Sequence, residues 1–207
     1  MSFRFSVTRP LAVAVALGLS ISAAAAQQSP TPTKVRGEIE RVDGDSLAVK
    51  SRSGQDVRLQ LAPDAKVAGI APIALSEVKP GSFIGATTVP GPNGAHNAVE
   101  IHIFPEAMRG TGEGSRAWDL GPNSTMTNAT VDQSVASNDG RTVTVKYKGG
   151  EKVITVTPKT QVVTYVPADK SDLKQGAKII AFGKTLPDGS FQTSRIAVGR
   201  DGITPPM

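Results

Sequence analysis

Two stretches of this chain resemble each other when the sequence is shifted by 95 positions. The coincidences fall on prolines and glycines, which fix special backbone geometry and are therefore hard to match by chance. The matched pairs are Pro63 and Pro158, Pro72 and Pro167, Gly81 and Gly176, Pro92 and Pro187, Gly94 and Gly189, and Ile101 and Ile196. Upstream the offset changes by one, because "LAVKSRSG" from Leu47 matches "VTVKYKGG" from Val143. We predict two copies of one unit, at residues 34–104 and 127–200.

Each copy contains short segments that are typical of β-strands. The segment "VRLQL" (Val57 to Leu61) alternates apolar and polar residues, which is the period of a half-buried strand. The segment "LSEVKPG" (Leu75 to Gly81) indicates one short helical turn that a glycine closes. The other strand candidates of the first copy are "VRGEIERV", "LAVK", "SFIGATTV" and "AVEIHIF", and the second copy repeats the whole series as "NATVDQSV", "TVTVKY", "KVITV", "SDLKQG", "KIIAFG" and "FQTSRIAV".

The order of these segments predicts the fold class. Three strands, a short helical turn and two further strands are the element order of an OB-fold, a five-stranded and partly open barrel. We therefore expect an all-β protein with two tandem small OB-like five-stranded barrels, each with one short helical turn. A Gly-rich linker at 105–126 would join the two modules, and a tail at 201–207 would follow the second.

The segments before the fourth strand of each copy also resemble a known family. They read "LSEVKPGSFIG" from Leu75 and "SDLKQGAKIIAFG" from Ser171, with the shared spacing S-x-L/V-K-x-G. These motifs are similar to those of bacterial exported domains of unknown function, which are small OB-like β-barrels often found in tandem behind signal peptides. The resemblance covers both copies. It implies an exported, barrel-like, non-enzymatic protein and brings no catalytic residue with it.

The N-terminus has the three-part pattern of a secretory signal peptide. Arg4 and Arg9 make a basic start, and the apolar run "LAVAVALGLSISAAAA" ends in small residues before Gln27. This run is shorter than the roughly 20 residues that span a bilayer. We expect a Sec-type signal peptide at 1–26 that is cleaved near Ala26, a disordered N-terminus at 27–33 and no transmembrane anchor after cleavage. The expected location is the periplasm or the medium.

Composition limits what the mature chain can be. The chain has no cysteine, so an exported form would be held by burial and hydrogen bonds alone. Its formal net charge of +5 falls to about +3 without Arg4 and Arg9, a mild surplus that is spread along the chain. No "G-x-S-x-G" elbow occurs, and both histidines lie on one predicted strand. We therefore expect no enzyme and no catalytic residues.

The stretch "MRGTGEGSRAWDLGPNS" from Met108 lies between the copies and contains the one tryptophan of the chain, Trp118. It lacks the lysine and serine or threonine that a phosphate-binding loop requires after its last glycine. Three interpretations stay open: a linker in which Trp118 packs between the modules, a plain linker, and a contact for a ligand or partner. Tryptophan and arginine dominate binding hot spots. The candidate contact residues are Arg109, Arg116 and Trp118, together with Tyr147.

A second candidate site is a metal centre at His96, Glu100 and His102. Residues at even spacing on a strand share one face, so these three would point outward while Val99, Ile101 and Ile103 point into the barrel. Zinc and copper sites usually need three or four ligands. An exposed polar strand face explains the same pattern. A divalent metal is thus the alternative to having no cofactor.

The third candidate is a basic strand surface. Its residues are Lys50, Arg52 and Arg58 in the first copy, and Lys146, Lys148 and Lys152 in the second. OB-folds bind oligonucleotides on such faces through stacked aromatic residues, but only Tyr147 is available here, and we expect no nucleic acid. A solvated face is one interpretation, and attachment to an anionic envelope polymer or an envelope protein is the other. The sequence as a whole predicts a binding or structural protein of the bacterial envelope, with a periplasmic metal-binding protein as the alternative.

Overall fold

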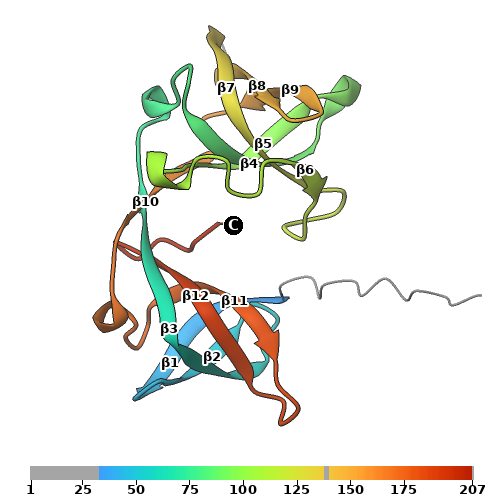
Figure 1. The fold of residues 1–207 in the computed structure, drawn as a ribbon. Helices are drawn as coiled ribbons and strands as arrows, with labels where there is room; N and C mark the ends of the chain where they lie inside the picture. Colours follow the sequence, from blue (N-terminus) through green and yellow to red (C-terminus); the bar gives the residue numbers. More distant parts are fainter. Residues whose placement is uncertain (1–32, 138–139, 207) are drawn as a thin grey trace, which may run out of the picture. The chain divides into compact units, whose positions relative to one another are not determined.

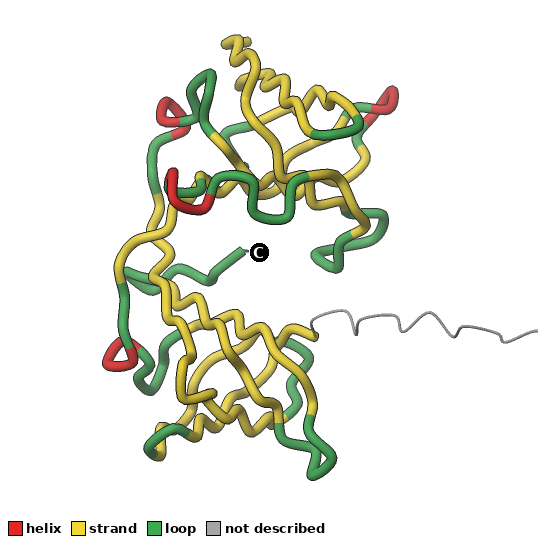
Figure 2. Tube along the Cα trace, in the orientation of Figure 1, coloured by secondary structure: helices red, strands yellow, loops and turns green. Residues whose placement is uncertain are grey.

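The computed structural model describes residues 33–137 and 140–206, and the part described is built from strands. The predicted signal peptide and nearly all of the predicted disordered segment 27–33 lie outside these residues. The prediction of an all-β chain is confirmed, since Figure 2 shows strands joined by loops and short helical turns. The strands are β1 (Thr33–Asp43), β2 (Ser46–Ser51), β3 (Asp56–Pro72), β4 (Phe83–Pro90), β5 (His96–Ile103), β6 (Gly114–Ala117), β7 (Thr125–Ser137), β8 (Gly140–Tyr147), β9 (Gly150–Val156), β10 (Gln161–Pro167), β11 (Lys178–Thr185) and β12 (Phe191–Gly199). Four 3₁₀ turns accompany them: η1 (Leu75–Glu77), η2 (Pro92–Gly94), η3 (Glu106–Met108) and η4 (Lys170–Asp172).

Five strands form a closed barrel. Their hydrogen-bonded order is β12-β11-β1-β2-β3, and a parallel pairing of β3 with β12 closes the ring. Figure 1 shows the result, because blue strands from the N-terminal part and red strands from the C-terminal part lie side by side. Apolar side chains from all five strands fill this barrel, among them Ile39, Leu47, Leu59, Ile179 and Ile196.

A second group of five strands has a matching pattern of neighbours in the sheet, although its strands follow one another along the chain in a different order. Its order is β5-β4-β7-β8-β9, and one parallel residue pair, Asn97 with Thr155, joins β9 to β5. The buried cluster inside it includes Ile84, Ile101, Val143 and Ile154. The closing pair is parallel in both groups: β3 with β12 in the first, and β5 with β9 in the second.

The strand pairings do not follow the predicted module boundaries of 34–104 and 127–200. The closed barrel joins β1, β2 and β3 to β11 and β12, whereas β4 and β5 join β7, β8 and β9. The cause lies in β3, which continues for 17 residues and pairs with β10 beyond the barrel. The chain therefore carries β4 and β5 away from the strands that precede them. Each five-stranded group contains strands of both predicted copies, and this corrects the expectation of one barrel per copy.

The pairing of β3 with β10 has the symmetry that the sequence offset predicts. Ile70 lies opposite Tyr165, and these residues are 95 positions apart. On either side, Gly69 pairs with Val166 and Ala71 pairs with Thr164. Gly69 and Thr164 are equivalent under the offset of 95, and so are Ala71 and Val166, so the offset converts one pair into the other. The two halves of the chain thus meet in a two-fold arrangement centred on Ile70 and Tyr165.

The predicted linker at 105–126 is more ordered than a plain linker. It contains η3 and β6, and β6 pairs antiparallel with β7 from Gly114 opposite Asn128 to Ala117 opposite Thr125. Gly110, Gly112 and Gly114 all have positive φ, which a residue with a side chain rarely adopts. These glycines allow the tight turns that place β6 on the edge of β7.

The predicted tail is also packed. Ile203 contacts the buried cluster that contains Ile70 and Ile180, and Pro205 and Pro206 are buried. A free tail would leave these apolar groups in water.

Candidate ligand-binding cavity

One cavity of about 340 Å³ collects most of the chemically distinctive side chains. Its wall comes from β5, β6 and β7, from β10, β11 and β12, and from the loop before β6. Aromatic rings, two arginines and one amide dominate the lining. The lining residues are His102, Phe104, Met108, Thr111, Gly112, Arg116, Trp118, Met126, Asn128, Tyr165, Phe182 and Arg195.

Three rings form the base of the cavity. Phe104 and Tyr165 stack with centroids 5.7 Å apart, and the His102 ring meets Phe104 edge-on at 4.6 Å. Burial, with a smaller effect of the Glu100 charge, raises the pKa of Tyr165, so its hydroxyl stays protonated at neutral pH. These rings offer an apolar surface that a planar group can stack against.

One of these three rings, the imidazole of His102, forms a buried pair with the carboxylate of Glu100. His102 Nδ1 and Glu100 Oε1 are 2.7 Å apart, and Thr87 Oγ1 donates to Glu100 Oε2 at 2.9 Å. Only 1% of Glu100 and 2% of His102 are exposed. Because Glu100 holds Nδ1, the second ring nitrogen of His102 is the one left for other contacts.

This geometry corrects the predicted outward set of His96, Glu100 and His102. Glu100 and His102 do share a face, but Phe104 and Tyr165 rings lie against His102 and bury it. His96 is exposed and apart from them. The strand carries an irregularity, since Thr87 pairs with Glu100 while Thr88 pairs with Ala98. Val99 is the additional residue, so Ala98 enters the core in its place.

The metal hypothesis gains no ligand set from the described residues. Within residues 33–137 and 140–206, no group of three or more His, Cys, Asp and Glu side chains lies close enough to hold an ion. Glu100 and His102 supply two donors that already bind each other. Metal binding stays a prediction, and a thermal-shift titration with zinc, copper and nickel tests it.

A glycine makes room for the imidazole. A Cβ atom at Gly85 would lie 2.2 Å from His102 Cε1 and Nε2 and 2.8 Å from Asn128 Oδ1. Gly85 pairs with His102 across the sheet. At the positions 95 residues later, Ile180 pairs with Ala197. In the first pair the small residue lies on β4 and the large one on β5, whereas in the second pair the large residue lies on β11 and the small one on β12.

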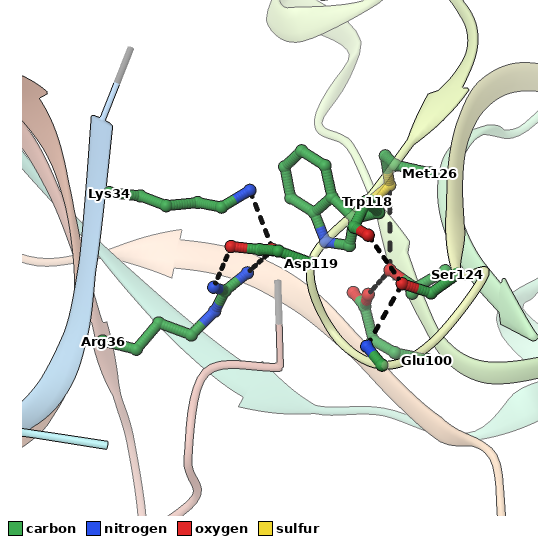
Figure 3. A network of polar contacts seen from close by, with 9 residues as sticks. Lys34, Arg36, Glu100, Trp118, Asp119, Ser124 and Met126 are labelled. Atoms are coloured by element: carbon green, nitrogen blue, oxygen red, sulfur yellow. Dashed lines mark hydrogen bonds and ion pairs between the residues drawn. The ribbon is translucent and has the colours of Figure 1, made fainter. Parts of the chain in front are cut away.

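Three cationic side chains lie near the indole of Trp118, and Figure 3 shows two of them, Lys34 and Arg36. The Lys34 ammonium is 3.2 Å from the centroid of a Trp118 ring, and the guanidinium carbons of Arg116 and Arg36 are 5.7 and 6.0 Å away. These distances are those of cation–π contacts. Since Lys34 and Arg36 belong to β1 of the closed barrel, Trp118 and Asp119 link β1 to the segment after β6. These contacts of Trp118 and Asp119 with Lys34 and Arg36 are what would support the predicted packing role of Trp118.

Asp119 holds two of these cations. Lys34 Nζ lies 2.9 Å from Oδ1, and Arg36 donates to both carboxylate oxygens at 2.9 and 3.0 Å. Burial acts to raise the pKa of Asp119, but the hydrogen bonds and charges of Arg36 and Lys34 outweigh it and lower the pKa to about 2. The carboxylate is therefore ionised at every physiological pH.

Two buried polar atoms on the cavity wall have no hydrogen-bond partner among the described residues: Trp118 Nε1, a donor, and Asn128 Oδ1, an acceptor. The amide nitrogen of Asn128 does have a partner, because Nδ2 donates to the Thr111 carbonyl at 2.8 Å. Buried polar groups are paired in most proteins, and an unpaired one costs about 1–3 kcal/mol. An unpaired donor and an unpaired acceptor on two residues that line one cavity point to a ligand.

Two arginines of the lining are likewise without an acidic partner in the described part of the chain. Arg116 donates to the Gly112 carbonyl at 2.8 Å, and burial lowers its pKa. The Arg195 guanidinium lies 5.2 Å from the centroid of the Phe182 ring. Guanidinium groups are built to bind carboxylate and phosphate oxygens.

The structure places the other predicted contact residues away from the cavity. Arg109 donates to Glu106 at 2.6 and 2.7 Å and to the Gly81 carbonyl. Tyr147 packs against the core of the second strand group. Of the predicted ligand contacts, only Arg116 and Trp118 line the cavity.

Two of the six cations of the predicted basic surface are paired with acids. Lys50 pairs with Asp56 at 2.8 Å, and Lys146 pairs with Asp132 at 3.0 Å. Lys152 donates to the hydroxyls of Ser115, Thr125 and Thr127. These contacts leave less free charge for an anionic polymer than the sequence suggests.

Sequence reasoning missed Asn128, Tyr165, Phe182 and Arg195. The offset of 95 offers one signal for two of them, because Tyr165 and Arg195 stand where the first half has Ile70 and Glu100. A residue that differs between the two equivalent positions is a candidate for a role that only one half has. Asn128 carries no such signal, since only the folded chain shows its acceptor to be open.

Comparisons with protein-family models, curated proteins and solved structures find no match to this chain. Within residues 33–137 and 140–206, none of the helical turns has the length and apolar character that a membrane span requires.

Proposed function

We propose that this protein binds a small organic ligand in the cavity lined by Trp118, Asn128 and Tyr165. The observation that carries the proposal is a pair of unpaired polar atoms, Trp118 Nε1 and Asn128 Oδ1, on two residues that line one cavity. Ligand pockets combine mostly apolar walls with a few well-placed polar groups. The stacked rings and the two open atoms match that description.

Binding without catalysis is the proposal, because the hydroxyl that contacts the pair of Glu100 and His102 is that of Thr87, which is fully buried. The pattern at residues 1–26 supports an exported binding protein of the cell envelope. Two tandem copies, supported by the offset of 95 and by the two-fold pairing of β3 with β10, would supply the two sides of the cavity.

Trp118 makes the proposal directly testable, because it is the only tryptophan in the chain. We would titrate the purified protein with three ring compounds of different charge (benzoate, benzamide and benzylamine) and record tryptophan emission. Saturable quenching by at least one of them is expected. Thr111→Tyr should abolish it by filling the cavity without adding a second tryptophan.

The matched control is Thr185→Tyr, which adds the same ring to an exposed position on β11 away from the lining. It should titrate like the unmodified protein. If none of the three compounds changes the emission, or if both variants behave alike, the cavity is not a binding site and the proposal fails.

A further inference from the structure

We infer that the ligand is a small aromatic carboxylate that also carries a hydroxyl group. This inference rests on the proposed function and names the chemistry of its ligand. Three features of the cavity carry it: an excess of positive charge, a wall of rings, and one open donor together with one open acceptor.

The charge around the cavity is positive even after the acids are counted. Four cations, Lys34, Arg36, Arg116 and Arg195, line the cavity or surround Trp118. Asp119 compensates the first two through direct contacts. The second carboxylate, Glu100, is already held by His102 and Thr87.

Arg116 and Arg195 are therefore the groups that an anion would meet. Each lines the cavity, and neither forms an ion pair with a described residue. A carboxylate accepts two parallel hydrogen bonds from one guanidinium, and such charged bonds are about twice as strong as neutral ones. A cationic ligand would instead be repelled.

The apolar part of the ligand follows from the walls. Phe104, Trp118, Tyr165 and Phe182 all face the cavity. Aromatic rings attract one another in offset and edge-on arrangements. A volume of about 340 Å³ lies near the lower end of the usual range of roughly 300–1,000 Å³ for ligand pockets, which favours a single ring over a large molecule.

The two open atoms specify the polar groups. Trp118 Nε1 needs an acceptor, which a carboxylate oxygen supplies. Asn128 Oδ1 needs a donor, which a carboxylate cannot supply but a hydroxyl can. A ring that carries a carboxylate and a hydroxyl therefore satisfies both atoms and one or both arginines.

Calorimetric titration with matched compounds tests the inference on the full chain. The probes are 4-hydroxybenzoate, benzoate, which lacks the hydroxyl, and 4-hydroxybenzamide, which lacks the charge. We expect 4-hydroxybenzoate to bind tightest, benzoate about 5-fold weaker through one lost hydrogen bond, and 4-hydroxybenzamide at least about 10-fold weaker through the lost charge. Phenyl phosphate is included as the competing anion.

Arginine variants separate the charge from the ring. Arg116→Leu and Arg195→Leu should weaken 4-hydroxybenzoate at least about 10-fold and change 4-hydroxybenzamide little. Asn128→Leu should abolish the preference for 4-hydroxybenzoate over benzoate. Arg52→Leu removes an exposed arginine outside the lining and should leave every affinity unchanged.

Each contrary result has a distinct meaning. Equal affinity for 4-hydroxybenzoate and 4-hydroxybenzamide would overturn the carboxylate, and tighter binding of phenyl phosphate would replace it with a phosphate, while the binding function stands. Failure of all four compounds to bind overturns the inference. The proposed function falls with it only if benzamide and benzylamine also leave the Trp118 emission unchanged.

Discussion

Ile70 and Tyr165 lie opposite each other in the antiparallel pairing of β3 and β10, although they occupy equivalent positions 95 residues apart in the two halves of the sequence. This pairing directs each half's last strands into the other half's group. The arrangement resembles domain swapping, carried out here within one chain. It also brings residues of both halves to one cavity.

Engineered cysteines test this exchange of strands, because the chain has none of its own. Glu38 on β1 pairs with Lys178 on β11. Paired residues of antiparallel strands lie within the range of Cα separations that a disulfide bridges. We expect Glu38→Cys/Lys178→Cys to form an intramolecular disulfide, which peptide mass spectrometry of the oxidised protein detects.

The control pair is Glu38→Cys/Phe83→Cys. Phe83 is the residue 95 positions before Lys178. A barrel built from residues 34–104 alone would place Phe83 opposite Glu38 on β1. A disulfide in this pair and none in the first would show that the strands are not exchanged.

Gly85→Ala should destabilise the protein by about 1–3 kcal/mol, the usual cost of overpacking a filled interior. The new methyl group would lie 2.2 Å from two atoms of the His102 ring. Urea unfolding followed by circular dichroism measures the loss. Gly121→Ala is the control, since no atom lies within 4 Å of its Cβ position. Equal stability of the two variants would mean that His102 does not occupy the space above Gly85.

Glu100→Ala should cost about 3 kcal/mol, because it leaves His102 and Thr87 without their buried partner. Glu100→Gln retains a side chain of the same shape and should cost less. Replacing both members of the pair in Glu100→Leu/His102→Leu should cost less than Glu100→Ala, since the imidazole is then no longer buried without a partner and only the Thr87 hydroxyl stays unpaired. The free energies of unfolding in urea decide this order, and a double variant that is the least stable of the three would contradict it.

Asp119→Asn should lower stability at neutral pH by about 1 kcal/mol. The folded pKa of about 2 lies below the ordinary 3.8, so the stabilisation is present above pH 3.8 and is lost as the pH falls through about 2. The full shift would correspond to a larger value, but the Asp119 side chain is 51% exposed and solvent weakens the contacts.

Melting temperatures of the unmodified protein and Asp119→Asn between pH 2 and pH 7 measure this contribution. The difference between them should shrink below pH 4. Asp56→Asn removes an exposed carboxylate paired with Lys50. Its melting temperature should match that of the unmodified protein at every pH. A difference that is constant with pH would show that Asp119 acts through shape alone.

Local sequence patterns predict the strands but not their partners. The alternation in "VRLQL" corresponds to β3, and the glycine that ends "LSEVKPG", Gly81, lies in the turn that follows η1. The same similarity that predicts two copies makes β4 and β11 equally suitable neighbours for β1. Only the unbroken course of β3 through Pro72 decides between them, and no periodicity encodes it.

The site was predictable only in part for a related reason. Trp118 is notable in any sequence, and Glu100 and His102 are adjacent on one strand face at even spacing. Their burial depends on Tyr165, which contacts His102 from a strand about 60 residues further along the chain. The irregularity at Val99, which separates His96 from them, has no signature in the residues around it.

The central claim is that the open Trp118 Nε1 receives a ligand, and one resonance reports on it. The chain has a single tryptophan, so its ¹H–¹⁵N spectrum contains one indole N–H signal. Titration with 4-hydroxybenzoate should move this signal downfield to a saturating position, because the N–H acquires an acceptor, and Thr111→Tyr should prevent the change. An indole signal that stays in place while the protein is saturated would contradict the account.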